Sequence, residues 1–217
     1  MSRHHHSTAA LAALTIVAAA THAQTVWYNG DPDLAGGRSA EFNTIVTDSY
    51  VFEDFDFGGG TITDIWGNYF MDFTAVGYMY EIRSNMSNGF GGTLHASGNT
   101  DGPFSQTLNG FSGLGFDGYR LSANIVDVTL GAGTYMLALS PIGSGAGQSF
   151  VQSTSGTNGI GSPNANNLNW YQSNYWNLNY WENNGYDFSY GVNVPAPASV
   201  ALLGLGGLIA TRRRRPG

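Results

Sequence analysis

The chain has 217 residues and no cysteine, and glycine occupies 31 positions, whereas charged residues make up only 11%. Between residues 24 and 193, three arginines stand against all 15 acidic residues, a net charge of −12, and the whole chain lacks lysine. This composition excludes a disulfide framework and argues against binding to nucleic acid or anionic lipid.

The first 23 residues are typical of a secretory signal peptide. Arg3 gives a short basic start, Ala9 to Ala20 form an apolar run, and Thr21-His22-Ala23 has the small-x-small pattern of a cleavage site. We expect export through the Sec machinery with cleavage after Ala23; Ala20 is the alternative site.

Residues 24–193 are enough for one extracellular domain with its own core. No segment in this span keeps a 3.6-residue period over more than about ten residues, whereas the many glycines and alternating apolar residues favour short strands and tight turns. We therefore expect an all-β fold of seven to nine strands, an antiparallel β-sandwich that is jelly-roll-like in topology.

The first turn of this domain carries a candidate calcium site. Asn29, Asp31 and Asp33 occupy alternate positions in a turn that contains glycine and proline, and oxygen ligands at such a spacing suit Ca²⁺. The pattern is incomplete as an EF-hand loop, so an ordinary solvated turn is the alternative. No other cofactor is expected.

Glycine clusters divide the middle of the chain. We expect a strand over 44–57 to end at Gly58-Gly59-Gly60, and the hairpin signal is strongest over 119–139, where Gly131-Ala132-Gly133 should turn the chain. Between them, residues 84–118 predict a loop-rich stretch with one modest strand near 93–96. We also expect a short strand that begins at residue 24, and strands over 61–66, 69–73, 76–83 and 149–153.

Catalytic motifs are absent from the sequence. There is no Gly-x-Ser-x-Gly elbow, no His-Glu-x-x-His pair and no phosphate-binding loop, and His95 is the one histidine outside the leader. Two carboxylates about 5.5 or 6.5–9.5 Å apart could hydrolyse glycosides, but sequence cannot place them. The candidates are Glu53, Asp54, Asp56, Glu81 and Glu182. We expect no enzyme, and a secreted glycoside hydrolase is the least favoured function.

An aromatic segment near the end of the domain repeats approximately every five residues. Its three pairs are Trp170-Tyr171, Tyr175-Trp176 and Tyr180-Trp181, interleaved with asparagines. In a continuous strand an odd spacing places rings on both faces. One interpretation is a platform on which sugar rings stack, and the other is that one face packs into the core while loops shield the other.

The last 24 residues have the three parts of a sorting signal. Val194-Pro195-Ala196-Pro197 is followed by an apolar helix over 198–211 and by a basic membrane stop, Arg212 to Arg215. With a rise of about 1.5 Å per residue, such a helix is shorter than the thickness of a hydrocarbon core, about 30 Å. It therefore suits transient rather than permanent anchoring. The arginines should stay in the cytoplasm and leave the domain outside.

This order of parts resembles the PEP-CTERM sorting signal of bacterial exosortase substrates. Ala196 stands where the usual motif has glutamate, and this Pro-Ala-Pro variant resembles that of planctomycete-like bacteria. The resemblance implies an exosortase as partner, a cut near residues 195–197, and a product at the cell surface or in the extracellular polysaccharide matrix of a biofilm. An ordinary single-pass tail anchor is the alternative.

The resemblance covers the tail and leaves the β domain open. We expect this domain to be a structural or adhesive component of the surface, and a glycan-binding module that uses residues 170–181 is the alternative.

Overall fold

The structure is a computed structural model that describes residues 23–43, 48–100, 104–143, 146–162, 165–183 and 185–196. These residues belong to one compact unit, Ala23–Ala196. The predicted signal peptide, the predicted sorting helix over 198–211 and the arginine cluster lie outside them. Within the described part of the chain, no helix has the length and apolarity needed to cross a membrane.

All regular elements of the described residues are strands, and they join in one 13-stranded, mostly antiparallel sheet. The all-β prediction is confirmed, with more strands than the seven to nine expected. The strands are β1 (Gln24–Tyr28), β2 (Pro32–Ser39), β3 (Glu41–Asn43), β4 (Asp48–Met71), β5 (Tyr78–Ser84), β6 (Thr93–Asn99), β7 (Phe104–Gly113), β8 (Phe116–Gly143), β9 (Ser149–Thr154), β10 (Asn169–Ser173), β11 (Leu178–Asn183), β12 (Asp187–Phe188) and β13 (Tyr190–Val194).

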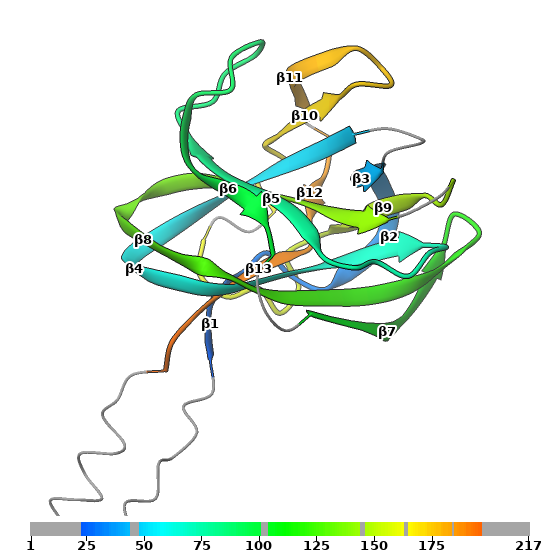
Figure 1. The fold of residues 1–217 in the computed structure, drawn as a ribbon, viewed down its shortest axis with the longest axis horizontal. Coiled ribbons are helices and arrows are strands. Elements are labelled where there is room, and N and C mark those ends of the chain that lie inside the picture. The colour runs from blue at the N-terminus through cyan, green and yellow to red at the C-terminus, as the bar shows by residue number, and fades with distance from the viewer. Residues whose placement is uncertain are drawn as a thin grey trace, which may run out of the picture. The chain divides into compact units, whose positions relative to one another are not determined.

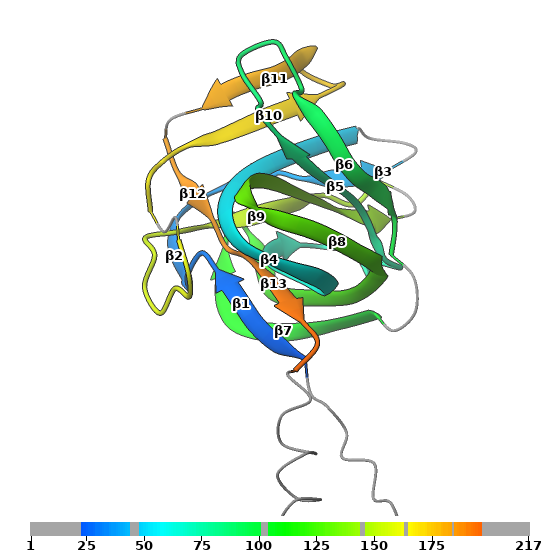
Figure 2. The same cartoon turned by 90° about the vertical axis from the view of Figure 1, so that its left-hand side faces the viewer.

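Two long antiparallel strands, β4 with 24 residues and β8 with 28, form the ribbon on which the sheet is built. The glycines expected to end or turn these strands instead lie opposite each other, because Gly58 pairs with Ala132 and Phe57 with Gly133. Figure 2 shows how strongly β4 and β8 curve. The predicted strand end and hairpin turn were wrong, since glycine lets a strand bend without breaking its ladder.

This bend divides the sheet into two halves. Before the bend, β4 lies between β10 and the final part of β8, and β5 and β6 continue this half. After the bend, β4 lies between the first part of β8 on one side and β13 and β9 on the other. Strand β7 then pairs with β8, and β1 pairs with β13.

Buried tyrosines connect the two halves through the core. The Tyr69 hydroxyl donates to the carbonyl of Leu139 at 3.1 Å, and the Tyr78 hydroxyl donates to the carbonyl of Leu121 at 3.0 Å. Each tyrosine lies in one half and its acceptor in the other. Because a buried hydroxyl needs a partner, these bonds help to fix how the halves pack.

The stretch 84–118 contains two strands, β6 and β7, where one was expected. Much of β7 is exposed, and its sequence FSQTLNGFSG shows no clear apolar alternation. It becomes a strand because it pairs with β8 from Phe104 opposite Ala123 to Gly113 opposite Phe116. Pairing with a neighbour outweighs weak local preference.

Strands β1 and β13 bring the two ends of the domain together. Gln24 pairs with Val194 and Tyr28 with Gly191. Figure 1 shows β1 and β13 side by side at the edge where both ends of the coloured chain leave the sheet. The first residue after the expected leader and the first residue of the expected sorting motif are thus neighbours.

Candidate functional site

The aromatic segment folds into a hairpin rather than a continuous strand. Strands β10 and β11 flank a turn over residues 174–177. The turn is anchored to the start of β4, because the backbone N–H of Asn174 donates to the carbonyl of Asp48 at 3.0 Å and its side-chain amide donates to the Asp48 carboxylate at 3.3 Å. The five-residue spacing therefore places one aromatic pair in β10, one in the turn and one in β11.

The three aromatic pairs have different environments. Trp170 and Tyr171 are buried in β10, where they contribute to the core, as the packing interpretation expects. Tyr175 and Trp176 are 66% and 64% exposed in the turn, and Trp181 is 43% exposed on β11. The structure therefore separates the six rings, and the middle pair is the most exposed of the three.

Tyr175 and Trp176 form the wall of a cleft. Their ring centroids lie 4.8 Å apart at an interplanar angle of 83°, an edge-to-face pair. The cleft has a volume of about 500 Å³. Its other lining residues come from distant parts of the chain: Ser39, Glu41, Ser49, Gln148 and Phe150.

Glu41 places a carboxyl group at the buried side of this cleft. Its side chain is only 2% exposed, and its Oε2 accepts the backbone N–H of Ser149 at 3.2 Å. Burial raises the pKa of Glu41 to about 7; the bond from Ser149 opposes this shift and the nearby Asp72 adds to it. The cleft thus combines aromatic walls with one carboxyl whose charge is expensive to bury.

Sequence reasoning found the exposed pair but missed Glu41, Gln148 and Phe150. These residues belong to β3, to the residues just before β9, and to β9 itself, at least 20 residues away from the aromatic segment along the chain. No local pattern marks them. Only the sheet brings them to the hairpin: β3 pairs with β4 and β4 pairs with β10, while Phe150 of β9 pairs with Ser39 at the end of β2.

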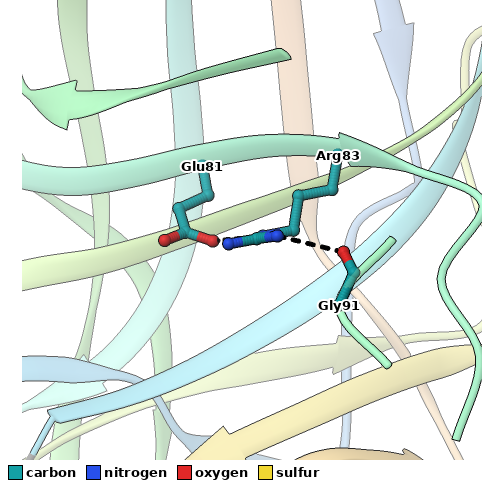
Figure 3. Close-up of polar contacts among 3 residues, drawn as sticks. All are labelled: Glu81, Arg83 and Gly91. Atoms are coloured by element: carbon teal, nitrogen blue, oxygen red, sulfur yellow. Dashed lines mark hydrogen bonds and ion pairs between the residues drawn. The ribbon is translucent and has the colours of Figure 1, made fainter. Parts of the chain in front are cut away.

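The third aromatic pair, Tyr180–Trp181, contacts the hairpin formed by β5 and β6. Arg83 forms an ion pair with Glu81 and donates to the carbonyl of Gly91 at 3.0 Å, as Figure 3 shows. Its guanidinium also lies 5.2 Å from the ring centroid of Tyr180. Tyr180 is therefore engaged within the protein, and of this pair only Trp181 is well exposed.

The two carboxylates of the predicted calcium site accept hydrogen bonds from protein groups, whereas the buried Oδ1 of Asn29 has no hydrogen-bond partner among the described residues. Asp31 accepts hydrogen bonds from the Tyr28 hydroxyl and the Asn158 amide, both at 2.7 Å. Asp33 accepts from the Ser153 hydroxyl, and the buried Asn29 amide donates to the carbonyl of Phe188. Within the described residues, no group of three or more His, Cys, Asp or Glu side chains could hold a metal ion.

The calcium site stays a prediction, because an ion could replace some of these hydrogen bonds. An unchanged melting temperature in millimolar Ca²⁺ after chelation would dismiss it.

Four of the five candidate hydrolase carboxylates are engaged by other groups of the protein. Glu53 is fully buried and accepts the N–H of Phe188, and Asp54 is 5% exposed and accepts from the Asn166 amide. Asp56 accepts from the Thr134 hydroxyl, while Glu81 is held by Arg83. Glu182, on β11, is not among the residues that line the aromatic cleft.

The lone histidine of the domain has structural partners. His95 lies within hydrogen-bond distance of the Ser84 hydroxyl, at 2.7 Å, and packs edge to face against Tyr135. Ser84 lies in β5 and Tyr135 in β8, and these two strands pair with each other in the same half of the sheet as His95.

The predicted sorting motif begins inside the fold. Val194 ends β13, and Pro195 and Val194 line a second hollow beside Gly58, Gly59 and Gly60. Pro197 lies outside the described residues, as do Arg212, Arg213, Arg214 and Arg215. The described chain therefore ends within the motif, at Ala196.

Comparison with known proteins gives no relative. The chain matches no protein-family model, and no curated protein or solved structure is similar to it.

Proposed function

We propose that this chain is an exported cell-surface or extracellular-matrix protein that an exosortase recognises and processes at its C-terminal signal. The Sec machinery exports it, the short tail holds it transiently in the inner membrane, and processing releases it to the surface or to the polysaccharide matrix. Its β domain is structural or adhesive, and its two bent half-sheets correspond to a jelly-roll-like sandwich.

The pairing of Gln24 with Val194 supports this proposal. A domain that is cut at both ends must keep its fold when the leader and the tail are removed. Here both predicted cuts fall at or beyond the outer ends of a paired strand, so neither removes a residue of the core. This arrangement fits a precursor with two removable segments.

The decisive experiment compares the intact mass and membrane fractionation of the protein from its host with and without exosortase. The proposal expects a product that lacks Arg212 to Arg215 only when the enzyme is present. An unprocessed protein in the inner membrane of both strains would instead support the ordinary tail anchor.

A glycan-binding module is the second candidate, and the exposed Tyr175–Trp176 pair favours it. Aromatic faces that border a cleft with amide, hydroxyl and carboxyl groups have the composition of a sugar site. Titrating the mature protein with polysaccharides should change its tryptophan fluorescence, and Trp176→Ala should remove the change. A response that survives Trp176→Ala would assign it to another tryptophan and count against this site.

The glycoside hydrolase remains the least favoured function. Prolonged incubation with the mature protein should leave the chain length of each polysaccharide unchanged.

A further inference from the structure

The aromatic cleft has an unbalanced set of charges. Among the described residues that line it, Glu41 is the one acidic side chain, and no arginine lines it. Two further acids act near this site: Asp72 raises the pKa of Glu41, and Asp48 accepts a hydrogen bond from Asn174 in the turn. The lining of the cleft therefore carries a negative group and no cation, and Arg38, which precedes the lining residue Ser39, lies 5.1 Å from the ring centroid of Tyr171.

The surrounding domain has the same sign. Residues 24–193 carry three arginines against 15 acidic residues. A negatively charged glycan, such as one made of uronic acids, would be repelled both by the domain and by Glu41. A glycan with positive charge would be attracted by both.

Two features of the cleft suit a cation on a sugar. The rings of Tyr175 and Trp176 have faces that attract ammonium groups, and each is exposed over more than half of its surface. Glu41 is buried, and burial raises the pKa of its carboxyl, so an ammonium partner would compensate the lost hydration of the carboxylate better than a neutral hydroxyl.

We propose that this cleft binds a glycan whose sugars carry free amino groups, with an ammonium recognised by Glu41 and the sugar ring stacked on Trp176 or Tyr175. This inference rests on the glycan-binding candidate and names the chemistry of its ligand. It distinguishes an amino sugar from the neutral and acetylated sugars that stacking alone would accept.

Three matched hexasaccharides test the inference, all β-1,4-linked: glucosamine, N-acetylglucosamine and glucose. They present similar ring faces and differ at the 2-position. Calorimetric titration of the mature protein at pH 7 and low salt should show the glucosamine oligomer binding about ten-fold or more tightly than the other two.

Variants separate the two parts of the site. Glu41→Gln keeps the acceptor for Ser149 and should weaken the glucosamine oligomer about ten-fold while changing the glucose oligomer little. Trp176→Ala, at an exposed position, should weaken all three. Trp181→Ala removes an exposed ring that does not line the cleft and should leave every affinity unchanged.

The outcomes distinguish this inference from the function on which it rests. Equal affinity for the three oligomers, lost in Trp176→Ala, would overturn the amino-sugar inference and keep the glycan-binding candidate. Tight binding of the glucosamine oligomer that survives both Glu41→Gln and Trp176→Ala would mean general attraction to an acidic domain, and would overturn the site. No binding of any oligomer would overturn the inference and count against the glycan-binding candidate as well.

Discussion

Gly59 of β4 lies against the backbone of Ala132 in β8, at the level where both strands bend. A Cβ atom on Gly59 would lie 3.2 Å from the Ala132 nitrogen, and the φ of Gly59 is +92°, a value that favours glycine. The neighbouring Gly58 has no atom within 4 Å of such a Cβ and no positive φ. Two adjacent glycines thus differ in how strictly the bend requires them.

This difference gives the first prediction. Gly59→Ala should lower the free energy of unfolding by about 1–3 kcal/mol, because it adds backbone strain and a close contact. Gly58→Ala, the matched control, should stay within about 0.5 kcal/mol of the natural protein. Urea unfolding of both variants measures the effect, and equal losses would show that the bend does not depend on the conformation of Gly59.

The second prediction concerns pH. The carboxyl of Glu53 is fully buried, so desolvation raises its pKa well above the ordinary value, and the carboxyls of Asp187 and Asp54 raise it further. The pKa of Asp54 itself is raised to about 6, chiefly by burial. The folded state therefore binds protons more tightly than the unfolded state, so the stability contributed by these protonated groups is complete below about pH 4 and is lost as pH rises through their folded pKa values.

We accordingly expect the melting temperature to fall between about pH 4 and pH 8. Glu53→Gln mimics the protonated acid and should raise the melting temperature at pH 8 by several degrees, with little effect at pH 4. Glu182→Gln on β11, which is only partly buried, is the control. A Glu53→Gln variant that loses stability equally at both pH values would contradict this account.

The third prediction concerns the contact between the β5–β6 loop and the aromatic hairpin. The N–H of Gly89 donates to the carbonyl of Tyr180 at 3.0 Å, and Arg83 joins Glu81, Gly91 and the Tyr180 ring. Arg83→Ala removes a charge-assisted network and should cost about 1–2 kcal/mol.

Hydrogen exchange locates this effect. The amide of Gly89 should exchange faster in Arg83→Ala, while amides in the β4–β8 ribbon keep their relative protection. Arg83→Lys keeps the charge but not the planar, multiply bonded group, and should give an intermediate rate. Unchanged exchange at Gly89 in both variants would show that the loop is held without Arg83.

The fourth prediction concerns the strand that follows the expected leader. Trp27 in β1 is fully buried and packs on Phe55, with ring centroids 5.2 Å apart. Trp27→Ala should therefore lower the free energy of unfolding by about 3–5 kcal/mol. The exposed Trp181→Ala should change it by less than about 0.5 kcal/mol, and comparable losses in the two would mean that β1 is not part of the cooperative core.

Several features of the fold follow from composition and local pattern. Residues 78–84 alternate and form β5 close to where it was expected, because one face of that strand is buried, and β9 also forms close to its expected position although it is buried along nearly its whole length. The failures occur at glycine clusters. Gly58-Gly59-Gly60 and Gly131-Ala132-Gly133 have the local signature of turns, and whether such a cluster turns or bends depends on the strand opposite it.

In the candidate site, too, some features follow from the sequence and others depend on the tertiary structure. The sequence by itself predicts two export signals at the chain ends, and it determines the acidic, lysine-free character of the domain and the concentration of rings between residues 170 and 181. These properties depend on residue type and short-range order alone. Which rings are exposed was decided by the tertiary structure, because the turn at 174–177 places Tyr175 and Trp176 outside the core while β10 buries Trp170 and Tyr171. The structure also supplied Glu41 and Phe150, since hydrogen-bonded strands bring together residues that no local pattern connects.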